Sequence, residues 1–297
     1  MRRVGVFFMP LRVGPLPNPP PQAGEGTDRD AIFAANRAVG RIDLSVKAHG
    51  GVTRRERVHE AGSLRVRCPN TTSPEMEAVI LNTAGGVAGG DRFDLDISVG
   101  QGARLAVTTA AAEKVYRTLG PDSTIDVKLH VKAGAALAWL PQETILFDRA
   151  RLARTIEADL AADARLLLVE GIIFGRSGMG ETVEEGALTD RWRIRRDGRL
   201  IYAETVRLDG AIAAKLGEAA VTRGGVAVAT VLIVPGDGAT VAAVRSLEAE
   251  FVGEVGASAW NGLAAVRLCA RDGAALRHDL VHVMTAVRGS LPRLWTN

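Results

Sequence analysis

A repeated unit is the feature that most constrains how this chain can fold. Three segments, DLDISVGQGARLAVT, DVKLHVKAGAALAWL and TIEADLAADARLLLV, follow one another and align on Ala103, Ala135 and Ala164. In each copy apolar and polar residues alternate on both sides of a short turn, which is the pattern of strand, tight turn and strand. A unit of about thirty residues that cannot bury its own apolar face is stabilised by stacking on its neighbours. We therefore expect a mainly β, layered fold of stacked strands, similar to a solenoid.

Equivalent positions of the three copies are apolar on one face of the strands and polar on the other. Three columns are apolar and two are polar, so each copy has one face suited to a core and one suited to water. The same alternation also permits ordinary hairpins in a β-sandwich, which is the alternative architecture. The apolar columns are Val99/Val131/Leu160, Leu105/Leu137/Leu166 and Val107/Trp139/Leu168, and the polar columns are Asp96/Lys128/Glu157 and Ser98/His130/Asp159.

The rest of the chain contains one further strand pattern and few helix patterns. RWRIRRD from Arg191 alternates like the repeats, whereas residues 240–251 and 275–287 have the periodicity of amphipathic helices. About two helices are thus expected, both in the C-terminal third. PLPNPPPQAGEGTDRD from Pro15 is too rich in proline and glycine to form a ladder or a helix. We expect residues 1–33 to be a disordered leader and residues 34–297 to form a single β-rich domain.

Composition argues against several classes of protein. The chain has 47% hydrophobic and 24% charged residues and a formal charge of +3, with basic and acidic residues interspersed. This is the composition of a globular protein without the basic stripe that binds nucleic acid. No apolar run approaches the ~18 residues that a membrane span requires. Cys68 and Cys269 lie far apart with no neighbouring cysteine, which is typical of a reducing compartment, so we expect a cytoplasmic protein.

A glycine-rich segment, LNTAGGVAGGD, begins at Leu81 and could suggest a phosphate-binding loop. It lacks the lysine and serine or threonine of a nucleotide-binding loop, and a strand pattern follows it instead of a helix. We expect its glycines to supply positive φ angles in a tight connection between strands. Asp91, which follows them, is then a turn-capping carboxylate, and its alternative role is that of a partner-binding or metal-route residue.

Several polar side chains are candidates for a metal route or a partner surface. Glu170 ends the apolar run LLLV, where burial of an unpaired carboxylate is costly, so it either pairs with an arginine such as Arg176 or lines a wet passage for a divalent cation. His278 and His282 are spaced to share one helix face, which makes them a weak metal-ligand pair beside the alternative of a solvated face. The remaining candidates are Glu143, Asp148 and Glu181 for the route, and Glu113, Lys114, Tyr116 and Arg117 for a partner surface or an ion-paired loop.

Seven segments in series resemble the UreD (UreH) family of urease accessory proteins over roughly Asn36 to Trp295. Their joint occurrence is specific, although each alone would be weak evidence. The segments are GSLRVRCP, LNTAGGVAGGD, TTAAAEKVYRT, WLPQETILFD, EGIIFGRSGMGE, GASAWNGL and LPRLW.

This resemblance implies a cytoplasmic, non-catalytic scaffold with a layered β fold and a couple of helices. It also implies a complex with a UreF-type accessory protein, a UreG-type GTPase and the urease apoprotein, in which Ni²⁺ passes transiently through the chain with no tightly bound cofactor. The internal route would involve Glu143, Asp148, Glu170 and Glu181. Two other functions stay open: a small-molecule hydrolase that uses Glu143, Asp148 or Glu170 as acid and base, and a purely structural β-solenoid module.

Overall fold

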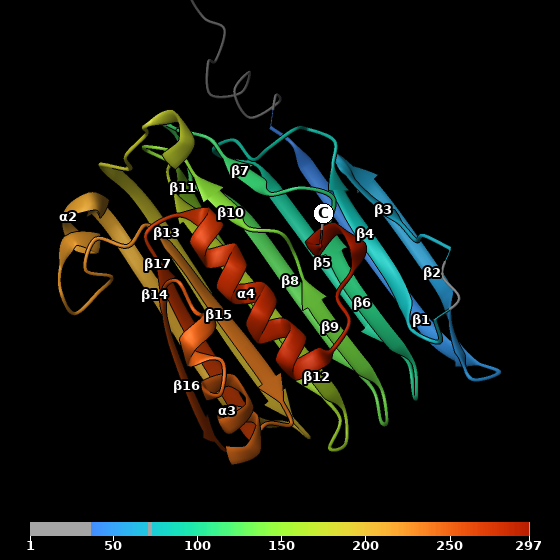
Figure 1. The fold of residues 1–297 in the computed structure, drawn as a ribbon. Helices are drawn as coiled ribbons and strands as arrows, with labels where there is room; N and C mark the ends of the chain where they lie inside the picture. The colour runs from blue at the N-terminus through green and yellow to red at the C-terminus, as the bar shows by residue number, and fades with distance from the viewer. Residues whose placement is uncertain (1–36, 71–72, 297) are drawn as a thin grey trace, which may run out of the picture. The chain divides into compact units, whose positions relative to one another are not determined.

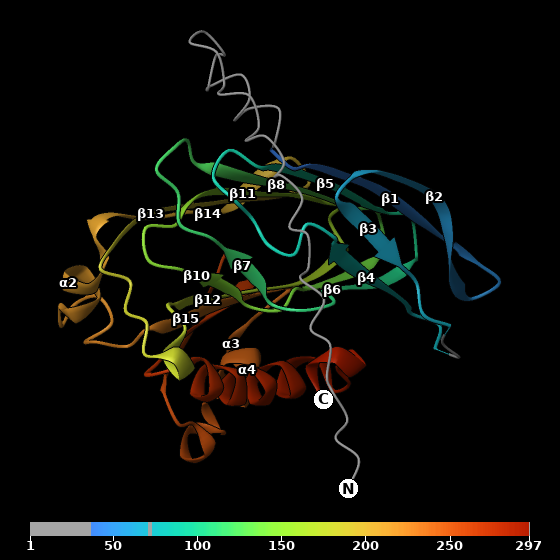
Figure 2. The same ribbon diagram turned by 90° about the horizontal axis from the view of Figure 1, so that it is seen from above.

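The computed structural model describes residues 37–70 and 73–296. Residues 37–297 form one compact unit, and the leader predicted for residues 1–33 lies outside the described residues. Figure 1 shows that this unit is built mainly from strands, with α4 lying against one sheet. Figure 2 shows three layers: a first sheet, a second sheet, and the helices α3 and α4 on the outer side of the second sheet. The predicted mainly β, layered class is confirmed.

The first sheet, sheet A, has seven strands in the order β14-β13-β11-β8-β5-β1-β2. Its five inner strands are parallel to one another, and only the two edge strands are antiparallel to their neighbours. Parallel neighbours require long connections, which here run through the other sheet. The strands are β1 (Val39–His49), β2 (Val52–Gly62), β5 (Arg92–Val99), β8 (Ser123–Val131), β11 (Arg151–Leu160), β13 (Glu185–Arg196) and β14 (Arg199–Ala211).

The second sheet, sheet B, has ten strands, eight of them in the order β16-β17-β15-β12-β9-β6-β4-β3. Strands β4, β6, β9 and β12 are parallel, and short strands β7 and β10 extend the same sheet beside the end of β12. The strands are β3 (Leu64–Arg67), β4 (Met76–Asn82), β6 (Arg104–Thr109), β7 (Glu113–Val115), β9 (Ala136–Leu140), β10 (Thr144–Leu146), β12 (Arg165–Phe174), β15 (Ala227–Val234), β16 (Glu254–Trp260) and β17 (Leu263–Ala270).

The repeat found in the sequence is the structural unit of both sheets. Each copy places its first strand in sheet A and its second in sheet B, as β5–β6, β8–β9 and β11–β12. The columns of the sequence alignment are the register of the sheets: Val99 pairs with Val131 and Val131 with Leu160, while Leu105 pairs with Leu137. The stacked arrangement is therefore correct, and the hairpin alternative is wrong because the strands of one unit belong to different sheets.

Two apolar cores hold the three layers together. The larger core fills the space between the sheets and includes the inward columns of the repeat. The second core lies between the outer face of sheet B and the helices, and includes Leu276, Leu280 and Val283 of α4. Burial of such side chains supplies most of the favourable free energy of folding.

Two of the helices form where the periodicity predicted them, α3 ends earlier than predicted, and the short α2 was not predicted. The helices are α2 (Ile212–Gly217), α3 (Gly238–Arg245) and α4 (Gly273–Arg288), and the 3₁₀ turns are η1 (Ser177–Met179), η2 (Glu248–Glu250) and η3 (Arg293–Trp295). Asp237 and Asp272 cap α3 and α4 by accepting the backbone N–H of Thr240 and Ala275. The pattern predicted over 240–251 divides into α3 and η2. Within the described residues, no helix has both the length and the apolar character needed to cross a membrane.

Candidate functional site

A cluster of charged side chains is buried between the two sheets. Arg154 on β11 and Asp190 on β13 are register partners in sheet A, and Glu170 lies on β12 in sheet B. All three side chains occupy inward positions of their strands and are only 4–5% exposed. Because burial of an unpaired charge is costly, their mutual contacts are essential to the fold.

The cluster is held by hydrogen bonds from both sheets. Arg154 donates from Nε to Oδ1 of Asp190 at 3.0 Å, from Nη2 to its Oδ2 at 2.6 Å, and from Nη1 to Glu170. Trp139 on β9 donates its indole N–H to Oε1 of Glu170 at 2.8 Å, and Trp192 on β13 donates to Oδ1 of Asp190 at 3.0 Å. The predicted alternative of an arginine partner for Glu170 is thus correct, but the partner is Arg154.

The cluster has one cationic side chain for two carboxyl groups. Burial raises the pKa of Glu170, and the charge of Arg154 opposes that rise. For Arg154 burial alone would lower the pKa, but Asp190 and Glu170 outweigh it and raise the pKa, so the guanidinium stays charged. When both carboxylates are ionised, Arg154 neutralises only one of the two charges, and a positive ion near Glu170 and Asp190 is attracted by the other.

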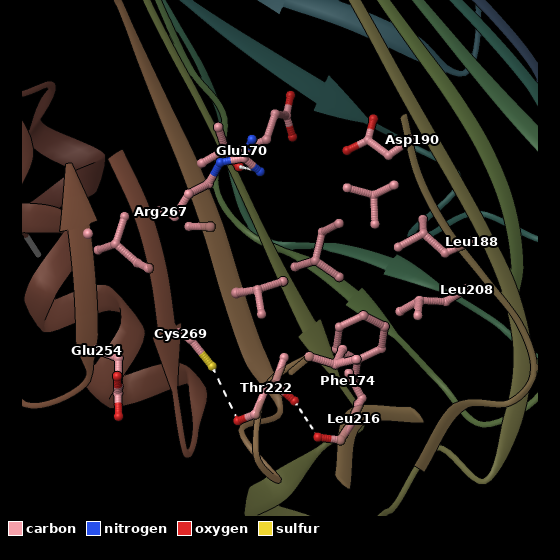
Figure 3. Close-up of a pocket in the computed structure, with 18 of the residues that line it drawn as sticks. Glu170, Phe174, Leu188, Asp190, Leu208, Leu216, Thr222, Glu254, Arg267 and Cys269 are labelled. Atoms are coloured by element: carbon pink, nitrogen blue, oxygen red, sulfur yellow. Dashed lines mark hydrogen bonds between the residues drawn. The ribbon is translucent and has the colours of Figure 1, made fainter. Parts of the chain in front are cut away.

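A cavity of about 510 Å³ borders these two carboxylates. It lies between β13 and β14 of sheet A and β15 and β17 of sheet B, and Figure 3 shows Glu170 and Asp190 toward one end, with Leu216, Thr222 and Cys269 toward the other. Most of its other walls are apolar. The cavity thus gives access to the carboxylates from the edges of the two sheets, where β14 and β16 lie.

Polar groups continue across the inner face of sheet B away from this cavity. The hydroxyl Oγ1 of Thr144 on β10 lies 3.5 Å from Nη1 of Arg154. Thr144 is also the register partner of Glu113 on β7. Glu113 faces the same side of the sheet as Val115, which is fully buried in the core between the sheets. Asn82 Nδ2 donates to both oxygens of Glu113, at 3.2 and 3.3 Å. Carboxylates and their partners therefore extend from the cavity to the end of β4.

We expect Glu113 to make stability depend on pH. Burial raises its pKa from 4.5 to about 7, and the hydrogen bond from Asn82 only partly opposes this. The unfolded chain then loses this proton at lower pH than the folded chain, so the contribution to stability is present below pH 4.5 and lost as pH rises to about 7. Glu113→Gln should abolish that loss and stabilise the protein at pH 8 by on the order of 3 kcal/mol.

Urea unfolding of the two proteins at pH 5 and pH 8 measures this effect. Glu157→Gln, on the outer face of sheet A, removes the same charge at a position on the water-facing side and is the control. If Glu113→Gln and the unchanged chain lost the same free energy of unfolding between pH 5 and pH 8, the raised pKa could not be assigned to Glu113.

The glycine segment forms the connection between β4 and β5. Gly85, Gly86 and Gly90 have positive φ angles, as predicted, and a side chain at Gly86 would collide with the ring of Tyr116. Tyr116 donates its hydroxyl to the carbonyl of Gly85 at 2.8 Å. Asp91 accepts the backbone N–H of Ala88 at 2.7 Å and that of Ala38 at 2.8 Å, so it acts as a turn-capping carboxylate.

The other predicted route residues are not part of the buried cluster. Glu143 faces the outer side of sheet B, where it accepts Arg277 of α4 at 2.8 and 3.1 Å. Asp148 accepts the backbone N–H groups of Glu184, which precedes β13, and Glu185, which begins it. Arg176 pairs with Glu181 at 2.7 Å, which is why it is not available to Glu170. The structure therefore brings Glu170 together with Asp190, and separates it from Glu143, Asp148 and Glu181.

The predicted surface and helix candidates are exposed to different degrees. Lys114, Tyr116 and Arg117 are exposed around β7, close to the glycine connection, and thus remain a candidate partner surface. His278 and His282 stack at 4.3 Å, but each ring also contacts a carboxylate, Asp279 and Glu250 respectively. In the part of the chain that the structure describes, no three or more His, Cys, Asp or Glu side chains converge as metal ligands would.

Arg154 and Asp190 are functional candidates that the sequence analysis did not single out. Both interrupt the apolar phase of an alternating strand, since Arg154 follows Leu152 and precedes Ile156, while Asp190 lies between Leu188 and Trp192. A charged residue in the inward phase of a strand indicates a buried polar contact. That signal was present and could have identified both.

Comparison with known proteins identifies the family. The family model described as "UreD urease accessory protein" matches residues 38–296. A urease accessory protein UreD from Rhodopseudomonas palustris strain HaA2 is 56% identical over 275 residues, which are 92% of this chain and 99% of the relative. The UreD of Bradyrhizobium diazoefficiens is 55% identical over 267 residues, 90% of this chain and 97% of the relative. The chain belongs to the UreD family of urease accessory proteins.

Proposed function

We propose that this chain is a non-catalytic maturation factor that helps deliver nickel to apo-urease and insert it. Family membership supports a role in urease maturation. The finer proposal is that the chain acts in the cytoplasm, in a complex with a UreF-type accessory protein, a UreG-type GTPase and the urease apoprotein, and that Ni²⁺ crosses the space between its two sheets as cargo.

The observation that carries the proposed route is the negative cluster on the cavity wall. Glu170 and Asp190 share the single charge of Arg154, and both border the cavity between the sheets. Borderline divalent cations accept carboxylate oxygens, and ligands that are few and partly occupied by other partners would bind them weakly. Weak binding suits transfer, because a tightly held ion would not be released. Glu113, further along the same face, would be the next carboxylate.

The hydrolase alternative receives less support from this arrangement. Its proposed acid and base, Glu143 and Glu170, point to opposite faces of sheet B, and each is bound by a different arginine. Two catalytic carboxylates must face one reacting bond. No such pairing of Glu143, Asp148 and Glu170 exists in the fold.

The test is made in cells that carry a urease operon with this gene intact, deleted, or changed at Glu170→Gln. Urease activity, nickel content of purified urease and the amount of urease subunits are measured together. Deletion should abolish activity and bound nickel while apo-urease remains abundant. Glu170→Gln should reduce both with the complex still assembled, because the amide keeps the Trp139 contact but lacks the charge. Glu157→Gln is the matched control and should leave both unchanged.

Two results would contradict these proposals at different levels. Unchanged activity and nickel after deletion would refute the maturation role altogether. Loss after deletion combined with normal nickel in Glu170→Gln would support maturation and refute the route through the buried cluster.

A further inference from the structure

A second cavity lies on the opposite side of sheet B from the proposed route. Its volume is about 400 Å³, and its walls include Arg104 on β6, Arg165 on β12 and Arg288 at the end of α4. Figure 1 shows the end of α4 reaching the region of β9 and β12 where this cavity is found. Three arginines around one small cavity concentrate positive charge at a place that the nickel proposal does not use.

Two of these arginines stand symmetrically about one small residue. Arg104 and Arg165 are both register partners of Ala136 on β9, which lies between them in the sheet. They occupy the outward phase of their strands, in line with Ala106 and Leu167 of the outer core. Neighbouring strands are ~4.8 Å apart, so the two backbones stand roughly 10 Å apart with a methyl group as the floor between them. Within the described residues, neither side chain donates to an acceptor.

The third arginine is fixed but incompletely satisfied. Arg288 donates from Nη2 to Glu75 at 2.5 Å and from Nη1 to the carbonyl of Ser290 at 3.3 Å. Its Nε is buried and has no acceptor among the described residues. Buried donors without an acceptor are rare in folded proteins, but this one is covered by protein atoms and does not border the cavity. Glu75 neutralises one of the three arginines, which leaves two positive charges around the cavity.

We propose that this cavity binds a small oxyanion that carries at least two negative charges, of the phosphate or polycarboxylate class. The planar fork of arginine matches the oxygens of such anions, and two forks from the strands on either side of Ala136 can bind one ligand. Arg288, whose charge Glu75 offsets, contributes a third guanidinium to the cavity wall. The cavity is too small for a folded partner, and the exposed side chains of Arg104 and Arg165 leave it accessible to a small anion from solvent. This site is independent of the nickel route.

Isothermal titration of the full chain with pyrophosphate and with citrate, at low salt, tests the proposal. Whichever anion binds the unchanged chain should bind the Arg104→Ala/Arg165→Ala variant at least one hundredfold more weakly. This corresponds to roughly tenfold for each lost arginine. Arg288→Lys, which keeps the charge but removes the planar guanidinium, should weaken binding by a smaller factor. The control is Arg199→Ala/Arg207→Ala on β14 of sheet A, which removes two exposed arginines that form no ion pair with any described residue.

The possible results distinguish a phosphate ligand from a carboxylate ligand, and both from the absence of an anion site. The site is supported if the unchanged chain and the control variant bind one of the anions and the Arg104→Ala/Arg165→Ala variant does not. The anion that binds more tightly shows whether the ligand is a phosphate or a carboxylate. Absence of binding of both anions overturns the proposal. Equal weakening in the two double variants also overturns it, because the effect would then be general charge attraction. Matching thermal melts of all variants show that none of these results comes from unfolding.

Discussion

Arg154→Met is expected to lower the free energy of unfolding by about 3–5 kcal/mol at pH 7. The substitution preserves most of the side-chain volume, so the loss comes from charge and not from a cavity. It leaves Glu170 and Asp190 buried on facing strands without the cation that both now share. Burial already raises the pKa of Glu170, and without Arg154 that pKa would rise further. Urea unfolding of the variant and the unchanged chain gives the difference directly.

A matched arginine on the same strand separates this effect from a general one. Arg151 also lies on β11, but it is partly exposed and pairs with Asp122, so Arg151→Met should cost at most about 1 kcal/mol. A variant that combines Arg154→Met with Glu170→Gln and Asp190→Asn removes all three charges. It should recover most of the lost stability, because replacing a whole buried ionic group is often close to neutral.

The combined variant also distinguishes a structural role from a role in nickel transfer. If the cluster only holds the sheets together, a stable protein with neutral side chains should still support urease maturation. If the carboxylates carry Ni²⁺, the same stable protein should fail. Equal stability losses for Arg154→Met and Arg151→Met would contradict the buried-cluster argument itself.

The fold could be predicted largely because its repeat is visible in single residues. Val99, Val131 and Leu160 occupy one column in the sequence and one row in the structure, since stacking of parallel strands places equivalent residues side by side. The third layer could not be predicted in the same way. The amphipathic pattern of α4 shows that the helix has an apolar face, but a local pattern does not state which sheet face receives it.

The candidate site was predicted only in part, for a related reason. Glu170 was recognisable because a carboxylate after four apolar residues is unusual. Its partner Arg154 lies sixteen positions earlier, in the opposite sheet, and only the fold brings the two together. Arg176 was favoured by proximity in sequence, but it turns toward Glu181. Strand phase predicts that a side chain points inward, whereas its contacts depend on which strands face each other.

The two faces of sheet B therefore carry different sets of polar side chains with separate contacts. The inner face carries Glu113, Thr144 and Glu170, and the outer face carries Glu143, which binds Arg277 of α4. The WLPQETILFD segment contributes to both faces, since Trp139 points inward and Gln142 contacts the C-terminal segment. Residues close together in this segment can thus belong to independent structural elements, one between the sheets and one under the helix.

Trp295→Ala is expected to lower the free energy of unfolding by about 3–5 kcal/mol, because it removes the anchor of the C-terminal segment. The side chain is 2% exposed, and its indole N–H donates to the carbonyl of Leu140 at 2.9 Å. The guanidinium of Arg277 lies 4.5 Å from the centre of its ring and binds Glu143 and Gln142. Truncation therefore leaves a cavity, an unpaired carbonyl and a loosened arginine at once.

Two further substitutions show which of these losses dominates. Trp295→Phe keeps a ring beneath Arg277 but lacks the indole N–H, so it should cost less than Trp295→Ala. Arg293→Ala, two residues earlier and exposed, should change stability by no more than about 0.5 kcal/mol. Hydrogen exchange adds a local measurement, since loss of the anchor should increase exchange in α4 before it does so in sheet A. If Trp295→Ala unfolded at the same urea concentration as Arg293→Ala, the C-terminal segment would not be holding α4 on sheet B.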